Sequence, residues 1–185
     1  CIKLDGTPMK EWTLASLRED MGYVPQDVFL FSDTIGRNIA FGSHRFLEDS
    51  EEVRLAAKNA GVASDIEGFE HGYGTLLGER GVNLSGGQKQ RISIARALVK
   101  APKILLLDDC LSAVDTETEE TILDAISKQD ASCTLMVSHR LASLRHADRI
   151  LVLDDGRLIE EGTHESLLDL KGLYATMYAQ QKAKD

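Results

Sequence analysis

The most constraining feature of the sequence is the segment KILLLDD at residues 103–109, a short and uninterrupted apolar run that ends in two acids. A run of this length without polar interruption predicts a strand that is buried on both faces, as in a parallel sheet. Comparable runs occur at residues 22–25, 134–139 and 149–153, and segments with helical spacing lie between them. We therefore predict an α/β fold with a mostly parallel sheet.

Residues 27–100, between the first two predicted strands, are too many for a simple crossover connection. They contain two clear helical patterns, at residues 50–59 and 87–99. We expect this segment to form a helical subdomain inserted into an α/β core. The core would then consist of residues 1–26 and 101–185.

The last part of the chain continues the core. Asp155 and Gly156 directly follow the apolar run at 149–153, and an Asp-Gly pair there predicts a hairpin turn. Helical spacing then returns at residues 163–170 and 172–181. We expect two closing helices at these positions.

Composition excludes several classes of protein. With 185 residues, 43% of them hydrophobic and 28% charged, the chain is large enough to bury a core. Its net charge of -9 provides no overall attraction for nucleic acid, so we expect no nucleic-acid partner. The cysteines Cys1, Cys110 and Cys133 lack the spacing of a zinc site or a disulfide framework, which favours reduced thiols. No apolar run approaches the roughly 20 residues of a membrane span.

A helix start with unusual composition lies in the segment NLSGGQKQR at residues 83–91. Ser85 and Gln88 have the spacing of a capping box, and apolar residues follow at helical intervals. The first turn of a helix offers unpaired N–H groups and partial positive charge. Gly86 and Gly87 would let an anion approach that backbone without meeting a Cβ. The alternative is an ordinary capped helix without a ligand.

The acids at the end of the KILLLDD run suggest a cation site. Asp108 and Asp109 follow a predicted buried strand, at the sheet edge where ligands of α/β proteins bind. A magnesium ion held through water would offset the repulsion between two neighbouring carboxylates. His139 ends the next predicted strand, so we expect it near the same edge. Asp115 precedes a second capping-box pattern at residues 116–119 and would begin a helix. The alternative for the acid pair is a solvated turn.

These segments together resemble the nucleotide-binding domain of an ATP-binding cassette (ABC) transporter. The resemblance covers essentially the whole chain, and its motifs occur in the order that the family shows. They are a Q-loop glutamine at Gln26 in GYVPQD, an exporter-type X-loop GERG at 78–81, a signature LSGGQ at 84–88, a Walker B strand ILLLDD at 104–109, a D-loop SAVD at 112–115 and a switch histidine at His139 in VSHR.

The resemblance implies the fold and the partner. The fold would be a partial RecA-like P-loop NTPase core with an inserted helical subdomain, spanning residues 1–185 as one partial nucleotide-binding domain. Two such domains would close face to face on two ATP molecules. Ser85, Gly86, Gly87 and Gln88, together with Asp115, would contact the ATP that is bound to the partner domain.

The resemblance also implies roles within the chain's own ATP site. Asp108 and Gln26 would hold Mg²⁺, and Gln26, Asp109 and His139 would be the catalytic residues. Charge stabilisation and positioning carry most of phosphoryl-transfer catalysis, which suits these residue types. Glu79 and Arg80 would face the transmembrane domain of an exporter at the cytoplasmic side of the cell membrane. The alternative for this pair is a solvated charge pair in a glycine-rich loop.

Two departures from the family pattern affect activity. No G-x-x-x-x-G-K-[ST] loop is present, and residues 36–42 have neither its spacing nor its lysine. We expect the strands that carry this loop to precede Cys1 in a longer protein, and this fragment alone to be inactive. The second departure is Asp109, which stands where most active members have glutamate. Its shorter stem predicts reduced hydrolysis at the chain's own site, as in one half of a heterodimeric exporter.

Other functions stay open. A soluble ABC ATPase of DNA repair or translation would share the core motifs, but GERG and the stretch at residues 29–35 favour an exporter. A regulatory module without hydrolysis would suit Asp109 but not the intact signature. An interaction domain would require the phosphate loop to be absent from the native protein. The sequence does not identify a transported substrate.

Overall fold

The structure is a computed structural model that describes residues 2–43, 45–129 and 133–183. The chain forms two compact units, Cys1–Val137 and Ser138–Asp185. Within the described ranges, every helix falls short of the length and apolar character that a membrane crossing requires.

A three-stranded parallel sheet organises the first unit. Its strands, in spatial order, are β3 (Met21–Val24), β4 (Ile104–Asp108) and β5 (Cys133–Val137). The parallel register sets Val24 beside Leu107 and Asp108 beside Val137, so all three carboxyl ends lie at one edge of the sheet. The predicted α/β fold with parallel strands is confirmed.

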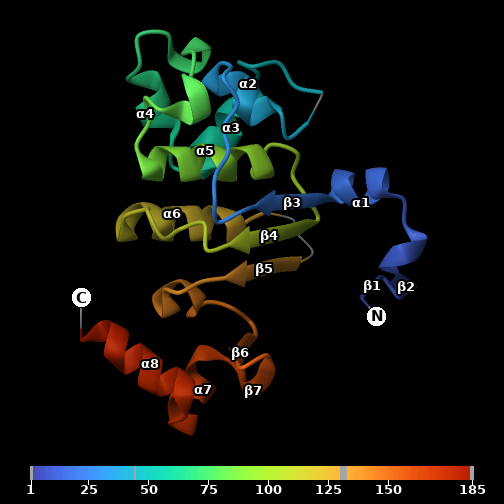
Figure 1. Ribbon diagram of the computed structural model, residues 1–185, viewed down its shortest axis with the longest axis vertical. Coiled ribbons are helices and arrows are strands. Elements are labelled where there is room, and N and C mark those ends of the chain that lie inside the picture. The colour runs from blue at the N-terminus through green and yellow to red at the C-terminus, as the bar shows by residue number, and fades with distance from the viewer. Residues whose placement is uncertain (1, 44, 130–132, 184–185) are drawn as a thin grey trace. The chain divides into compact units, whose positions relative to one another are not determined.

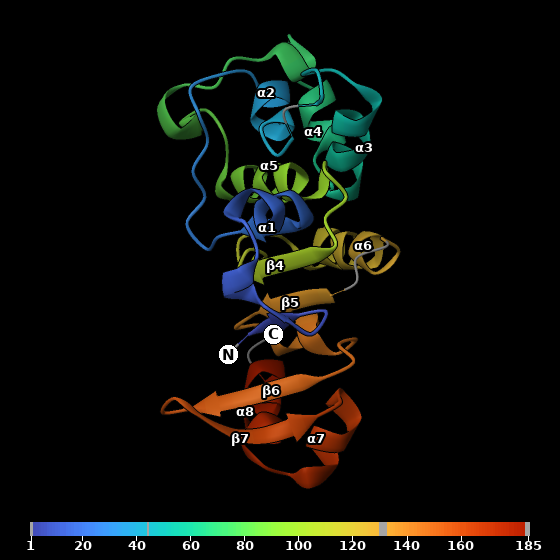
Figure 2. The same cartoon turned by 90° about the vertical axis from the view of Figure 1, so that its right-hand side faces the viewer.

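Helices of the first unit lie beside this sheet (Figures 1 and 2). The segment between β3 and β4 contains α2 (Ile35–Ala40), α3 (Glu51–Asn59), α4 (Ala63–Glu67), the short 3-10 turns η2 (Gly72–Gly74) and η3 (Glu79–Gly81), and α5 (Gly86–Leu98). Helix α5 packs against β3 on one side and against α2 and α3 on the other. The predicted helical insertion is therefore present, and α5 joins it to the sheet.

Some elements of the first unit were not predicted. They are the antiparallel pair β1 (Lys3–Leu4) and β2 (Thr7–Pro8), the 3-10 turn η1 (Met9–Glu11) and helix α1 (Leu14–Asp20).

Helix α6 (Thr116–Ser127) follows β4. Its N-cap is Asp115, whose side chain accepts a hydrogen bond from the Thr118 N–H. The helix start predicted at Asp115 is confirmed, whereas a capping box at residues 116–119 is wrong because Thr116 already lies inside the helix.

Two expectations about the strands are also wrong. In β4 only Leu105 and Leu107 are fully buried, and the alternate residues are partly exposed, so the strand is not buried on both faces. Strand β5 lies at one edge of the three-stranded sheet, and most of its residues are exposed. It also ends at Val137, so His139 does not terminate a strand. An apolar run alone does not distinguish a central strand from an edge strand.

The core of the first unit is built from the inward faces of the helices and β4. Val53 and Ala57 of α3 and Ile92 and Ile94 of α5 are among its fully or almost fully buried side chains. Ser50 caps α3 by accepting a hydrogen bond from the Val53 N–H. A serine cap followed by two acids and spaced apolar residues is the local reason why this helix forms.

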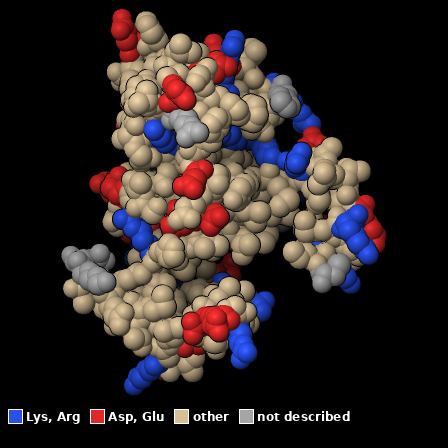
Figure 3. Space-filling view, viewed as in Figure 1, with Lys and Arg blue, Asp and Glu red and all other residues tan. Residues whose placement is uncertain are grey.

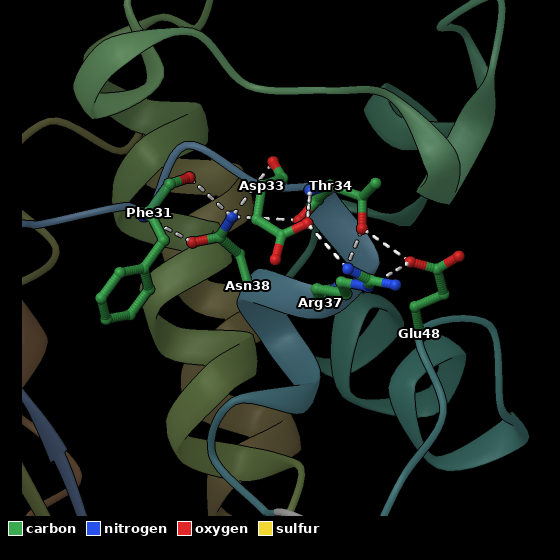
Figure 4. A network of polar contacts seen from close by, with 6 residues as sticks. All are labelled: Phe31, Asp33, Thr34, Arg37, Asn38 and Glu48. Carbon is green, nitrogen blue, oxygen red and sulfur yellow. Dashed lines mark hydrogen bonds and ion pairs between the residues drawn. The ribbon is translucent and has the colours of Figure 1, made fainter.

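Helix α2 is fixed by a buried asparagine (Figure 4). The Asn38 side chain is 1% exposed and accepts a hydrogen bond from the Phe31 N–H at 2.8 Å. Its amide nitrogen donates to the carbonyl oxygens of Phe31 and Thr34, both at 3.0 Å. Nearby, Arg37 forms an ion pair with Glu48, which also accepts the Thr34 hydroxyl hydrogen bond. These bonds tie the loop before α2 to the helix itself.

The second unit is a hairpin with two helices. Its elements are the 3-10 turn η4 (Leu141–Leu144), the antiparallel strands β6 (Ile150–Asp154) and β7 (Arg157–Gly162), and helices α7 (His164–Leu170) and α8 (Leu173–Lys182). Asp155 and Gly156 both have positive φ, as the predicted hairpin turn requires. The side chains of Leu141, Leu167 and Tyr174 form the centre of a small core. The hairpin and both closing helices are confirmed.

Acidic and basic side chains are mixed on the face of the molecule that Figure 3 shows, where they lie interspersed among uncharged ones. Over the whole sequence, 30 acids stand against 21 lysines and arginines.

Candidate functional site

The start of α5 has the geometry that the sequence predicted. Ser85 is the N-cap, and its hydroxyl accepts a hydrogen bond from the Gln88 N–H at 3.2 Å. In return, the Ser85 N–H donates to Gln88 Oε1 at 3.0 Å, which completes the capping box. Ser85 and Gly86 are exposed. The first turn of a 13-residue helix is thus held in place with its backbone accessible.

The two glycines of this turn have different surroundings. A Cβ on Gly86 would find its nearest neighbour, the Ala113 Cβ, at 3.9 Å, so the backbone there is open. A Cβ on Gly87 would lie 2.8 Å from the Ala113 carbonyl oxygen, which is too close for any side chain. Gly86 therefore fits the predicted approach of an anion. For Gly87 the structure gives a further reason, because the Ala113 backbone occupies the space.

Gln88 is also held from the side by residues that the sequence did not single out. Its amide nitrogen donates to Asp65 Oδ1 at 2.8 Å. The other oxygen, Asp65 Oδ2, forms an ion pair with Arg91 Nη1 at 2.8 Å, and both charged side chains are mostly buried. Gln88 and Arg91 are three residues apart on α5 and so share a face. That spacing was the only available sequence signal, because Asp65 comes from α4.

The end of β4 carries the predicted acid pair. Asp108 is the last residue of the strand and is partly exposed. Asp109 is 8% exposed, has a φ of 43°, and donates its N–H to the Val137 carbonyl at 2.8 Å. Aspartate is one of the few residues besides glycine that adopt this left-handed conformation readily. Burial, helped by the charges of Asp109 and Asp108, raises the pKa of the neighbouring Cys110 thiol to about 12.

Gln26 lies at the same sheet edge as this acid pair. It follows β3 by two residues, and β3 is parallel to β4 with Val24 beside Leu107. Gln26 is exposed. The register therefore brings Gln26 and Asp108 to one edge of the sheet. That they share a magnesium ion stays a prediction.

His139 belongs to the second unit, where its position is set locally. Its carbonyl oxygen accepts a hydrogen bond from Gln181 Nε2, and Gln181 Oε1 accepts the Leu141 N–H at 2.9 Å. The His139 side chain is exposed. The predicted approach of His139 to Asp108 stays a prediction.

The remaining predicted residues lie in turns. Asp115 is fully exposed, and the hydrogen bond from the Thr118 N–H lowers the pKa of its carboxyl group. Glu79 is exposed and begins η3, which ends at Gly81 with a φ of 65°. The side chain of Arg80 lies outside the described part of the structure. The predicted contact of Glu79 and Arg80 with a membrane domain therefore stays a prediction.

The residues fit the expected ligands by their chemistry. Mg²⁺ binds oxygen ligands and keeps several waters, so one carboxylate and one amide oxygen at a sheet edge are sufficient protein ligands beside phosphates. Among the described residues, no group of three or more His, Cys, Asp or Glu side chains is placed to hold a metal alone. The glycines at positions 36 and 42 do not form a phosphate loop, because the Glu48 and Arg96 backbones pack directly against them.

Comparisons with a family model and with individual proteins both identify ATP-binding cassette proteins as relatives of this chain. The family model described as "ABC transporter" matches residues 1–112. The chain is 46% identical to human ATP-binding cassette sub-family B member 6 over 100% of its length and 22% of the relative's. It is 49% identical to the ATM1-type heavy metal exporter of Novosphingobium aromaticivorans over 99% of its length and 30% of the relative's.

A flippase and a solved structure extend this comparison. The chain is 48% identical to the ATP-dependent lipid A-core flippase of Alcanivorax borkumensis over 96% of its length and 30% of the relative's. A structure of a bacterial Atm1-family ABC exporter with ATP bound matches with a TM-score of 0.90 and 49% identity, covering 96% of this chain and 31% of the other. The chain thus spans less than a third of the length of these relatives.

Proposed function

Because the chain belongs to the ABC transporter family, we propose that it is the ATP-binding and ATP-hydrolysing domain of an exporter. The observation that carries this proposal is the exposed, capped helix start at Ser85–Gln88, with an open backbone at Gly86. The names of the relatives, among them an exporter and a flippase, support transport out of or across a membrane. The domain would then work at the cytoplasmic face of that membrane, joined to transmembrane domains near Glu79 and Arg80.

The helix start serves a second nucleotide-binding domain. Ser85, Gly86, Gly87 and Gln88 contact the γ-phosphate of an ATP molecule that is bound to this partner, and Asp115 lies at the same interface. The unpaired N–H groups and positive dipole of the first turn of α5 favour this anionic ligand. The Gln88 side chain is already engaged with Ser85 and Asp65, so its main task is to fix the turn.

The chain's own ATP site lies at the carboxyl edge of the sheet. Asp108 and Gln26 hold Mg²⁺, which neutralises charge on the phosphates when it is bound. Asp109 orients the attacking water, and His139 contacts the γ-phosphate. Asp109 has one methylene fewer than glutamate, and a misplacement of about 1 Å can lower a rate by about a hundredfold. We therefore infer a slow own site and a heterodimeric assembly, in which this chain lends its helix start to a faster partner site.

The direct test is a matched pair of cap substitutions in the assembled transporter. Ser85 and Ser50 both cap a helix by accepting an N–H hydrogen bond from the third helical residue. Ser85→Ala and Ser50→Ala should therefore cost similar stability, about 1 kcal/mol. Only Ser85→Ala should also reduce ATP-driven closure of the two domains and ATP turnover. Equal activity of the two variants would refute the proposed function of the helix start.

The inferred asymmetry has its own test. Asp109→Asn should reduce total ATPase activity much less than the matching substitution in the partner domain, because the partner site carries most of the turnover. Steady-state ATPase rates of the two single variants decide the matter. Equal losses would show that the two sites contribute equally, and the heterodimer inference would then be wrong.

A further inference from the structure

Gln90 is a buried polar residue to which neither the signature nor the strand-end acids assign a role. It lies on α5 one turn after the exposed helix start and is 8% exposed. Its Oε1 accepts a hydrogen bond from the Ala113 N–H at 3.0 Å, and its Nε2 donates to Ser112 Oγ at 3.5 Å. Burying an amide is costly unless both ends are paired, and here both ends meet the same turn.

The turn that Gln90 contacts is connected to the acid pair. The Ser112 hydroxyl donates to the Asp109 carbonyl oxygen at 3.1 Å. Asp109 in turn donates its N–H to the Val137 carbonyl at 2.8 Å. A continuous series of hydrogen bonds therefore runs from α5 through Ser112 to the backbone of Asp109.

Close packing joins the same two segments. Gly87 and Gln90 are three residues apart on α5 and so lie on one face of the helix. A Cβ on Gly87 would lie 2.8 Å from the Ala113 carbonyl oxygen, while the Ala113 N–H bonds to Gln90. The peptide groups around Ala113 are thus held by the helix start on one side and by the Gln90 amide on the other.

We propose that Gln90 is a positioning residue that fixes the helix start Ser85–Gln88 against the turn Ser112–Asp115. Its amide keeps the two segments in register, so that both meet the partner's nucleotide in one arrangement. This inference rests on the proposed function of the helix start. It adds a residue that touches no nucleotide and acts through those that do.

The test is Gln90→Met in the assembled full-length transporter. Methionine has the length and flexibility of glutamine, so it keeps the packing and removes both hydrogen bonds. Turnover per folded molecule should fall roughly tenfold. A misplacement of about 1 Å can lower a rate about a hundredfold, and the loss of these two hydrogen bonds should cause a smaller displacement. Nucleotide binding to the open domains, measured with a fluorescent ATP analogue, should stay unchanged. Gln180→Met, at an exposed position of α8, is the matched control and should leave turnover unchanged.

A double-mutant cycle with Ser85→Ala separates positioning from a general loss of packing. If Gln90 acts through the helix start, the double variant should be about as slow as the slower single variant. Fold-losses that multiply would overturn the inference, as would wild-type turnover of Gln90→Met. In both cases an effect of Ser85→Ala alone would leave the proposed function standing. If Ser85→Ala has no effect, the proposed function itself fails.

Discussion

The two ends of α5 differ in what they contact, although they belong to one helix. At its start, Ser85 and Gly86 are exposed and backbone groups are open to a ligand. In its last turn, Arg96 is inserted into the protein and its polar atoms bind other segments. A single helix can therefore leave its first turn exposed because its last turn anchors it to other segments.

The anchor consists of three hydrogen bonds from one guanidinium group. Arg96 Nε donates to the Asn38 carbonyl at 2.8 Å, Nη2 donates to Asn38 Oδ1 at 2.8 Å, and Nη1 donates to the Phe29 carbonyl at 2.9 Å. The group also lies over the rings of Phe31 and Phe41, at 5.4 Å and 5.9 Å from their centres. Burial lowers the pKa of Arg96 to about 10, so the group is still charged at neutral pH. Only arginine can provide this set of donors.

The largest expected effect is on stability, at the anchored end. Arg96→Met should lower the free energy of unfolding by about 3 kcal/mol, since it removes three hydrogen bonds and leaves the carbonyl oxygen of the buried Asn38 without the Arg96 donor. Arg45→Met, which removes an exposed ion pair with Glu19, should cost at most about 1 kcal/mol. Urea unfolding measures both. Similar losses in the two variants would mean that Arg96 does not anchor the helix.

The next effect is on activity, at the open end. Gly87→Ala places a Cβ 2.8 Å from the Ala113 carbonyl, so the helix start must shift. ATP turnover of the assembled transporter should then fall by at least about tenfold, because a misplacement of about 1 Å can cost about a hundredfold and this shift is a substantial part of that distance. The Cβ that Gly86→Ala adds has the Ala113 Cβ, at 3.9 Å, as its nearest neighbour in this chain. A fall in turnover for Gly86→Ala at unchanged stability would therefore indicate that the added Cβ meets the bound nucleotide. Unchanged turnover for Gly87→Ala would contradict the close packing at that position.

The smallest effect concerns the residue that supports the open end from α4. Asp65→Asn keeps the shape of the side chain but can accept from only one of Gln88 and Arg91 at full strength. We expect a loss of about 1–2 kcal/mol in stability, as for a partly buried charge pair that loses one member. Thermal unfolding and turnover should both change less than in the two preceding cases. A wild-type melting temperature would show that Asp65 does not hold Gln88 in place.

Local sequence patterns predicted the start of α5, but they did not predict the contacts of this helix with residues far away in the sequence. The capping box joins Ser85 and Gln88, which are neighbours in sequence, and it could be read directly. The pairs Gln88–Asp65 and Arg96–Asn38 join residues 23 and 58 positions apart. Neither aspartate nor asparagine carries a sequence signal that names its distant partner, so only the fold reveals these contacts.

For the strands, too, local sequence patterns predicted where an element lies but not which neighbours cover it. The apolar run before Asp108 correctly indicated β4, and the Asp155-Gly156 pair correctly indicated the hairpin of the second unit. The exposure of β5 was missed because burial depends on neighbouring strands rather than on the run itself. The end of β5 was also misplaced, because the strand ends at Val137 and His139 lies two residues beyond it.

Whether the start of α5 meets a nucleotide held by another domain can be measured with a photoreactive ATP analogue. The reactive group is attached to the γ-phosphate, and the analogue is bound to the assembled transporter under conditions that close the domains. Labelling of this chain should fall within residues 85–91, and it should be lost when the partner's ATP site is disabled. Labelling that persists without the partner's site, or that never reaches these residues, would contradict a contact with the partner's nucleotide.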